Sequence, residues 1–181
     1  MNHLREETTV KRIVADPGKC LACRACELAC ALAHADSDDL VQAIFAEGAK
    51  PRIYIESAGG LTVPLQCRHC EDAPCVRVCP TGALSRPGET GPVLAHQEKC
   101  IGCEFCVQAC PFGVIRLTPD GKVVIKCDLC IRRQAEGLEP ACVAACPVGA
   151  LALEDVAEGA KKARVKAAAD VAAASLAQSL E

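Results

Sequence analysis

The sequence predicts an α+β protein that is assembled from short β-hairpins and small helices and ends in a long C-terminal helix. The main observation is that all sixteen cysteines fall into four groups of four. In chain order these groups are Cys20, Cys23, Cys26 and Cys30; Cys67, Cys70, Cys75 and Cys79; Cys100, Cys103, Cys106 and Cys110; and Cys127, Cys130, Cys142 and Cys146. A second observation is that a similar sequence begins at the fourth cysteine of three groups: CPTGAL at 79–84, CPFGVI at 110–115 and CPVGAL at 146–151. Such self-similarity indicates one supersecondary unit that is used several times.

Short segments rich in β-branched residues flank the cysteine groups and are expected to form strands. TVKRIVAD (9–16) leads into the first group. RIYIES (52–57) and LTVPLQ (61–66) alternate around Ala58, Gly59 and Gly60, which predicts a hairpin. Residues 114–126 predict a second hairpin that turns at Pro119, Asp120 and Gly121.

Helices are expected in three settings. The three-residue gap between the third and fourth cysteine of a group, followed by proline, indicates one helical turn that then stops. The first group departs from this rule, because Ala31 follows Cys30. Residues 31–50 are expected to be an insertion with a short helix. Residues 156–180 are rich in alanine, the best helix former, and their scattered charges exclude a transmembrane helix.

Large side chains are scarce in the chain. It has 181 residues, enough for one compact domain, but no Trp, one Tyr and three Phe. A core built from side chains alone would be thin, so we expect something else to fill the interior.

Composition also bounds the compartment and the partners. The N-terminal residues lack the apolar run and cleavage site of a secretory signal, and no window reaches the ~18 consecutive apolar residues of a membrane span. We therefore expect a cytoplasmic protein whose cysteines bind metal rather than form disulfides. The net charge of −3 and the pI of about 5.8 give no basic surface for nucleic acid.

The spacing of the cysteines points to iron–sulfur chemistry. CIGCEFCVQACP at 100–111 fits C-x2-C-x2-C-x3-C-P, the run that ligates [4Fe–4S] clusters in bacterial ferredoxins. Three thiolates two residues apart can wrap around one corner of a cubane. The fourth lies one helical turn further on, about 6 Å along the axis, and in two-cluster ferredoxins it ligates the other cluster. Sixteen cysteines then account for four clusters with none left over.

Other interpretations of the chemistry are weaker. Four zinc sites of four thiolates each would also use all sixteen cysteines, but zinc ligands normally come as separated pairs. His69 is expected to tune a cluster or to pack rather than to ligate, and His3, His34 and His96 to lie at the surface. Charged residues near the cysteines are expected to solvate and partly neutralise the clusters; these are Arg68, Arg77, Lys99, Lys126, Arg132 and Arg133. No catalytic residues are predicted, since the chain shows no Ser/His/Asp set, P-loop or isolated carboxylate pair.

With these motifs in view, residues 9–154 resemble the four-cluster, ferredoxin-like electron-transfer subunits of anaerobic oxidoreductases. The resemblance rests on CLACRACELACALAH, LQCRHCEDAPCVRVCPTGAL, CIGCEFCVQACPFGVI and CDLC…ACVAACPVGAL. It implies tandem modules of the bacterial ferredoxin type, each with two [4Fe–4S] clusters. The implied domains are a four-cluster domain at 1–155, with an inner half at 64–118 and an outer half at 9–35 together with 119–154, and a helix at 156–181.

The resemblance also implies how the groups pair, the first with the fourth and the second with the third. The implied ligand sets are Cys20, Cys23, Cys26 and Cys146; Cys127, Cys130, Cys142 and Cys30; Cys67, Cys70, Cys75 and Cys110; and Cys100, Cys103, Cys106 and Cys79.

The implied partners are a catalytic oxidoreductase subunit and a downstream electron acceptor or donor. The segment CELACALAH is most similar to the electron-transfer subunits of carbon monoxide dehydrogenases. The corresponding subunits of tungsten or molybdenum aldehyde oxidoreductases and of formate dehydrogenase–hydrogenase complexes are close alternatives. The C-terminal helix is expected to dock on a partner or on another copy of the chain, or else to lie free on the surface.

Iron analysis tests this interpretation. Protein purified without oxygen is expected to be brown and to carry about 16 Fe per chain, because four complete thiolate sets hold four cubanes. A colourless protein that contains zinc, or one with far fewer iron atoms, would contradict the prediction.

Overall fold

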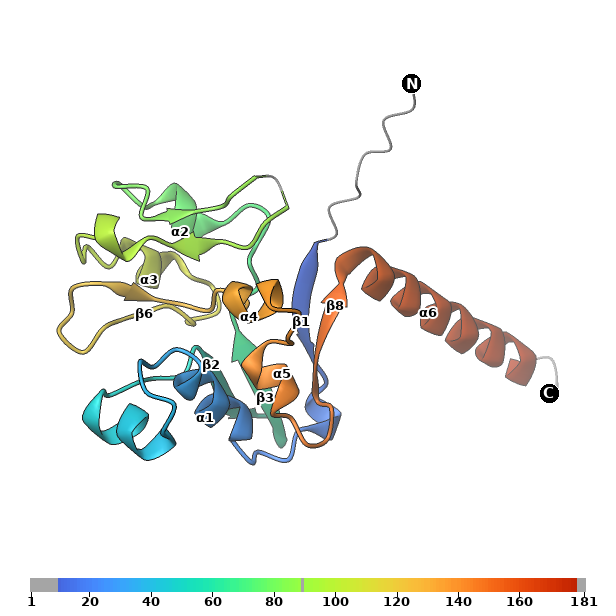
Figure 1. Cartoon of the computed structure of the whole chain (residues 1–181). Helices are drawn as coiled ribbons and strands as arrows, with labels where there is room; N and C mark the ends of the chain where they lie inside the picture. The colour runs from blue at the N-terminus through green and yellow to red at the C-terminus, as the bar shows by residue number, and fades with distance from the viewer. Residues whose placement is uncertain (1–9, 89, 179–181) are drawn as a thin grey trace, which may run out of the picture.

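The computed structural model describes residues 10–88 and 90–178, which form two cysteine-rich modules and one projecting helix (Figure 1). The strands are β1 (Lys11–Ala15), β2 (Ile53–Ala58), β3 (Leu61–Gln66), β4 (Leu84–Ser85), β5 (Leu94–Ala95), β6 (Arg116–Leu117), β7 (Val124–Ile125) and β8 (Leu151–Asp155). The α-helices are α1 (Ala25–Leu32), α2 (Pro74–Arg77), α3 (Phe105–Ala109), α4 (Ile131–Ala135), α5 (Ala141–Ala144) and α6 (Val156–Gln178). Short turns of other helix types are η1 (Pro17–Lys19), η2 (Gln42–Ala46) and η3 (Gln97–Lys99).

The strands pair antiparallel, two by two. The hairpin β2–β3 turns at Gly59 and Gly60, both at positive φ, and β6–β7 pairs Arg116 with Ile125; the sequence predicted both hairpins. The pair β4–β5 and the strand β8 were missed. β8 pairs with β1 from Lys11 opposite Asp155 to Ala15 opposite Leu151, and thereby joins the two ends of the cysteine-bearing chain.

The pairings and helix contacts define the modules. The outer module contains β1, α1, β2, β3, α5 and β8, with α1 packed against α5. The inner module contains α2, β4, β5, α3, β6 and β7, with α2 packed against α3. Figure 1 shows the two modules side by side, with α4 between them. The observed α+β architecture agrees with the predicted class.

Three of the predicted single-turn helices are present as α2, α3 and α5, each ending one or two residues before the fourth cysteine. α1 is longer, with eight residues, because Ala31 can continue a helix where proline cannot. α4 lies in the long gap of the fourth cysteine group and was not predicted. α6 confirms the C-terminal helix as far as Gln178, and the rest of the predicted helix lies outside the described residues.

A tight turn follows each helix that proline stops. In each C-P-x-G sequence the glycine N–H donates to the carbonyl oxygen of the fourth cysteine, at 3.4 Å for Gly82, 3.2 Å for Gly113 and 3.3 Å for Gly149. Proline at the second position and glycine at the fourth favour such a turn, and all three glycines have φ between 60° and 65°. The repeated motif therefore encodes a change of chain direction directly after the fourth thiol.

The first two cysteines of every group are joined by the same backbone conformation. The residue two positions after the first cysteine is left-handed in all four groups, with φ of 56° at Ala22, 47° at His69, 68° at Gly102 and 59° at Leu129. Such a bend turns successive backbone N–H groups toward one side, which suits a bound anion.

The core divides between the modules and contains many cysteines. The outer cluster of buried residues is Ile13, Cys26, Cys30, Ile53, Ile55, Leu129, Cys142, Val143 and Leu151. The inner cluster is Ala73, Cys75, Leu84, Val93, Cys106, Ile115 and Val124. All three phenylalanines, Phe45, Phe105 and Phe112, are exposed, so no aromatic ring of that kind fills either core.

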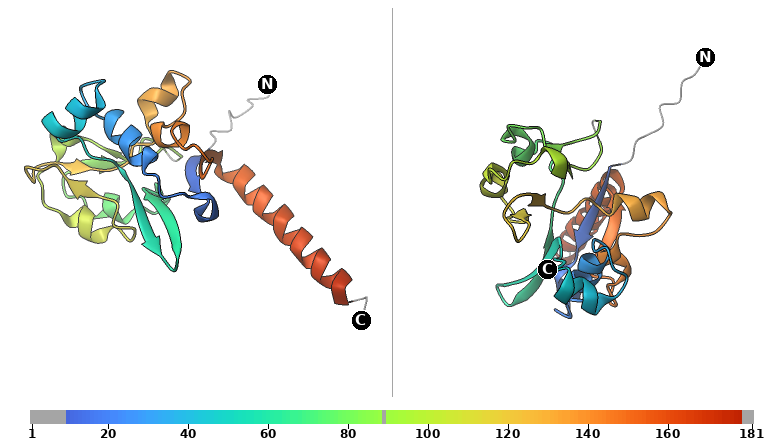
Figure 2. Two further views of the ribbon diagram at one scale, coloured as in Figure 1. Left: turned by 90° about the horizontal axis from the view of Figure 1, so that it is seen from below. Right: turned by 60° about the vertical axis from the view of Figure 1, so that its left-hand side comes forward.

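α6 projects from the outer module, and its main packing contact is with β8 (Figure 2). It begins at Val156 because the Asp155 carboxylate accepts hydrogen bonds from the N–H groups of Ala157 and Glu158, at 2.8 and 3.1 Å. Lys162 pairs with Glu154 at 2.9 Å. Among the described residues no helix is both long and apolar enough to cross a membrane.

Gly102 offers a test of this packing. Ala22 and Leu129 show that the left-handed position tolerates a side chain, but a Cβ at Gly102 would lie 2.9 Å from the carbonyl oxygen of Gly121 and 3.2 Å from that of Lys122. Gly113 has φ of 62° and nothing within 4 Å of its would-be Cβ. Gly113→Ala is expected to cost about 1 kcal/mol of strain, and Gly102→Ala about 2 kcal/mol or more, because a backbone clash is added. The temperature at which the visible absorbance is lost, measured at one scan rate, compares the stabilities of the two variants. Equal destabilisation of both would show that the predicted backbone clash at Gly102 is absent.

Candidate metal centres

Two cavities of the inner module are each lined by four thiols that come from two cysteine groups. Cys67, Cys70 and Cys75 share one cavity with Cys110, at the C-terminal end of α3. Cys100, Cys103 and Cys106 share the other with Cys79, which follows α2. In both cavities the fourth thiol comes from the other cysteine group.

Four thiols of the outer module are more deeply enclosed. Cys127, Cys130, Cys142 and Cys30 are all buried, and the charges of Cys30, Cys127 and Cys130 reach Cys142. Cys26 is buried in the same core, with Cys20 and Cys146 packed against it, while Cys23 is exposed. The first and fourth cysteine groups therefore meet in the outer module, and all sixteen cysteines are free thiols.

Backbone N–H groups donate to several of these sulfurs. At the left-handed bends, His69 donates to Cys67 Sγ and Leu129 to Cys127 Sγ, both at 3.4 Å. After the C-P-x-G turns, Leu84 donates to Cys79 Sγ at 3.4 Å and Ala150 to Cys146 Sγ at 3.2 Å. Donors of this kind stabilise negative charge on sulfur, so the local structure suits thiolates.

The thiol pKa values follow burial and these donors. Desolvation raises the pKa of Cys75 to about 11, with a further contribution from Cys67, and desolvation also raises that of Cys26 to about 11. At Cys79 and Cys146 desolvation is outweighed by backbone hydrogen bonds, which lower the pKa. Metal ligation needs thiolates, so binding at the buried sets must be strong enough to displace protons.

His69 is fully buried beside the cavity of Cys67, Cys70, Cys75 and Cys110. Its Nδ1 accepts the N–H of Val93 at 3.1 Å, and burial, followed by the positive charge of Lys126, lowers its pKa to about 3. The imidazole is therefore neutral with its hydrogen on Nε2, an atom that has no partner among the described residues. The expectation that His69 tunes a cluster remains a prediction.

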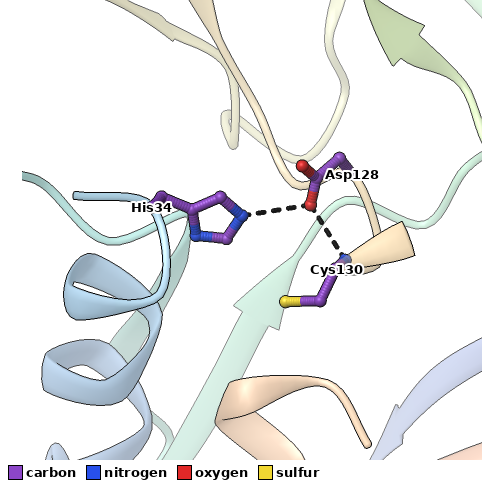
Figure 3. A group of neighbouring side chains, drawn as sticks. All are labelled: His34, Asp128 and Cys130. Carbon is purple, nitrogen blue, oxygen red and sulfur yellow. Dashed lines mark hydrogen bonds and ion pairs between the residues drawn. The ribbon is translucent and has the colours of Figure 1, made fainter. Parts of the chain in front are cut away.

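The expectation that His34 lies at the surface was wrong. Its side chain is only 12% exposed, and Nε2 contacts Asp128 Oδ1 at 3.1 Å (Figure 3). Its Nδ1 lies 2.7 Å from the carbonyl oxygen of Cys30. Burial opposes the charged form, but hydrogen bonds to Asp128, Cys130 and Cys30 outweigh it and raise the pKa of His34 to about 12. His96 is partly exposed, hydrogen-bonds Ser85 at 3.0 Å, and so is closer to the expectation; His3 lies outside the described residues.

Asp128 is the centre of a polar link between distant parts of the chain. Besides His34, it accepts a hydrogen bond from Arg52 at 2.9 Å and from the N–H of Cys130 at 2.9 Å. His34, Asp128 and Cys130 lie close enough together to hold a metal ion. Because both carboxylate oxygens already have partners, and Cys130 belongs to a buried set of four thiols, we interpret this group as a support for the cysteine run rather than as a further metal site.

Comparison with known proteins gives a consistent result. Two family models described as a 4Fe-4S dicluster domain match residues 59–156 and 19–84. The chain is 41% identical over 157 residues to an iron–sulfur protein of Rhodospirillum rubrum, covering 80% of this chain and 82% of the relative. It is 40% identical over 158 residues to the electron transport protein HydN of Escherichia coli, covering 79% and 87%. It is also 40% identical over 156 residues to the thiosulfate reductase electron transfer subunit PhsB of Salmonella typhi, covering 83% and 77%.

Asp128→Asn tests the polar link. The neutral amide leaves the partly buried charges of Arg52 and His34 without a counter-ion, so we expect a loss of about 2 kcal/mol and a fall in Tm of about 4–8 °C. Asp72→Asn is the matched control, because Asp72 pairs with Arg77 at an exposed position where ion pairs contribute little. Similar small changes in both variants would contradict the assigned role of Asp128.

Proposed function

The chain belongs to the 4Fe-4S dicluster domain family, and from that premise we propose that it is a non-catalytic subunit that relays single electrons between a catalytic oxidoreductase and a second redox partner. It is an iron–sulfur electron-transfer protein, and its sixteen cysteines suffice for four [4Fe–4S] clusters. The observation that carries the proposal is that two cavities of the inner module are each lined by four thiols, drawn from two groups of the sequence. No thiol is left over to form an open catalytic site.

We infer four ligand sets. They are Cys20, Cys23, Cys26 and Cys146; Cys127, Cys130, Cys142 and Cys30; Cys67, Cys70, Cys75 and Cys110; and Cys100, Cys103, Cys106 and Cys79. Support comes from the shared cavities of the inner module and from the shared core of the outer one. We also propose one domain at 1–155 with two halves, an inner half at 64–118 and an outer half built from 9–35 and 119–154. The modules of the structure differ from these bounds at their edges, because β2 lies in the outer module and β7 in the inner one.

Electrostatic interactions between thiols of different sets favour an arrangement of the four clusters in a single row. Cys26 acts electrostatically on Cys142, Cys67 on Cys127, and Cys106 on Cys75, so each set has a neighbour in the order in which they are given above. The set of Cys127 is wholly buried, whereas Cys23 of the first set is exposed. This burial fits a central position for the second set and a terminal position, open to a redox partner, for the first.

When bound, each cluster would supply reversible one-electron transfer. The chain's own contribution is to hold the thiolates, to donate backbone N–H groups to their sulfurs, and to exclude water from the central sets. Within each module, a short distance between the two sets follows from the single helical turn that separates the third and fourth thiol of a group.

The catalytic partner is a separate part of the proposal. CELACALAH favours a carbon monoxide dehydrogenase, although none of the three relatives reported above is named for that enzyme. The name of PhsB links that relative to thiosulfate reductase, which keeps other oxidoreductases, including tungsten or molybdenum enzymes and formate dehydrogenase–hydrogenase complexes, as alternatives. Purification of the native complex from the cytoplasm, where we propose that the chain works, and the mass of its neighbour would decide between them.

Cys79 tests the crossed ligand sets. Replacing Cys79 by Ala is expected to remove the cluster of Cys100, Cys103 and Cys106 rather than that of Cys67, Cys70 and Cys75. Two reference variants identify the lost cluster. Cys103→Ala removes a ligand of the cluster of Cys100, Cys103 and Cys106, and Cys70→Ala removes a ligand of the cluster of Cys67, Cys70 and Cys75. The EPR spectrum of the reduced Cys79 variant should match that of the Cys103 variant; a match with the Cys70 variant would contradict the pairing.

The C-terminal helix tests the assembly. α6 is exposed along its length as far as Ser175 and carries no cysteine, so we propose that it docks on a partner or on a second copy. Truncation after Asp155 is expected to leave the iron content near 16 per chain while reducing the size of the native complex or of the isolated oligomer in multi-angle light scattering. Unchanged sizes in both measurements would show that the helix is not a docking element.

A further inference from the structure

Lys126 is a buried lysine at the boundary between the two modules. It directly precedes Cys127, and only 2% of its surface is exposed. Its ammonium donates hydrogen bonds to the carbonyl oxygens of Val93 and Cys127, the second at 2.6 Å. Val93 also donates its N–H to His69 Nδ1. This one residue therefore connects Lys126 with the cavity of Cys67, Cys70, Cys75 and Cys110, which it lines, while the lysine itself adjoins the set of Cys127.

The charge of Lys126 has no carboxylate counter-ion among the residues that the structure describes. Lysine is almost never fully buried unless it is paired, because desolvation of an isolated ammonium is costly. Asp128 is close in sequence but is held by His34 and Arg52. Arg12 and Arg86 add to the positive potential that Lys126 exerts on His69. The protein thus gathers positive charge at this boundary, and an anion is needed to balance it.

The ammonium of Lys126 lies beside both central sets. Val93, whose carbonyl oxygen accepts one of its hydrogen bonds, lines the cavity of Cys67, Cys70, Cys75 and Cys110. The other acceptor is the carbonyl oxygen of Cys127, a member of the second set. A cubane with four thiolate ligands is anionic, so these sets would provide the missing negative charge.

We propose that Lys126 is the shared counter-ion of the two central clusters, those of Cys127, Cys130, Cys142 and Cys30 and of Cys67, Cys70, Cys75 and Cys110. This inference rests on the ligand sets of the proposed function. Because an added electron is stabilised by a nearby cation in a medium of low dielectric constant, Lys126 raises both reduction potentials. It makes the middle of the row easier to reduce than the same clusters would be without it.

The chain provides two matched controls. Lys19 precedes Cys20 and Lys99 precedes Cys100, as Lys126 precedes Cys127. Both of these lysines are exposed, so water and salt screen their charges. Burial, rather than position in the motif, distinguishes Lys126.

An EPR-monitored redox titration of the holoprotein tests the proposal. The variants are Lys126→Gln, which removes the charge but keeps hydrogen-bond donors, Lys126→Arg, which keeps the charge, and the controls Lys19→Gln and Lys99→Gln. In Lys126→Gln, two of the four one-electron steps should move to lower potential by at least a tenfold change in the reduction constant, about 59 mV for one electron. Lys126→Arg and the two controls should shift by less than half as much.

Each outcome bears on the charge of Lys126. Four intact clusters with unchanged potentials in Lys126→Gln, or an equal shift in Lys99→Gln, would overturn the proposal alone. Loss of iron from Lys126→Gln with full loading of Lys126→Arg would support it, because charge is then needed to retain the clusters. Loss of iron from both would show that shape matters instead, and would overturn it. Wild-type protein without four clusters would overturn the proposed function as well.

Discussion

A single helical turn separates the third thiol from the fourth in each cysteine group, and the rest of the structure depends on that separation. One turn of helix advances the chain by about 5–6 Å, which carries the fourth thiol away from the first three. Cys110 instead lies with Cys67, Cys70 and Cys75, and Cys79 with the next group. Pairs of groups must therefore fold together, which explains why α2 packs on α3 and α1 on α5, and why β1 closes the outer module against β8.

Sulfur takes the place of aromatic side chains inside this protein, and the polar groups are arranged accordingly. The two cores contain five buried cysteines, while Phe45, Phe105 and Phe112 lie at the surface. Backbone N–H groups at the left-handed bends and after the C-P-x-G turns point at thiols. A buried lysine without a carboxylate partner would be unfavourable in an ordinary core. Beside two anionic clusters the same charge stabilises the fold and favours reduction of the clusters. One buried residue therefore affects both the stability of the protein and its reduction potentials.

Local signals carried most of the predictable structure. The glycine pair at Gly59 and Gly60, the proline after the fourth cysteine and the alanine-rich C-terminus each act within a few residues, and the hairpin, the short helices and α6 follow from them. The misses concern long-range partners. Lys11 in β1 pairs with Asp155 in β8, and His34 contacts Asp128, 94 positions away in the sequence. No local sequence pattern predicts either of these contacts. Lys126 and Lys99 are alike in sequence, and only the fold buries one of them.

The central claim is that each cluster is held by three thiolates from one cysteine group and one from another. Anomalous diffraction at the iron edge, from crystals grown without oxygen, tests it most directly. We expect four compact iron sites in one row. The fourth cysteine of each group, which is Cys30, Cys79, Cys110 or Cys146, should lie at the site held by the first three cysteines of the group with which its own group pairs. Four sites that are each enclosed by the four cysteines of a single group would contradict it.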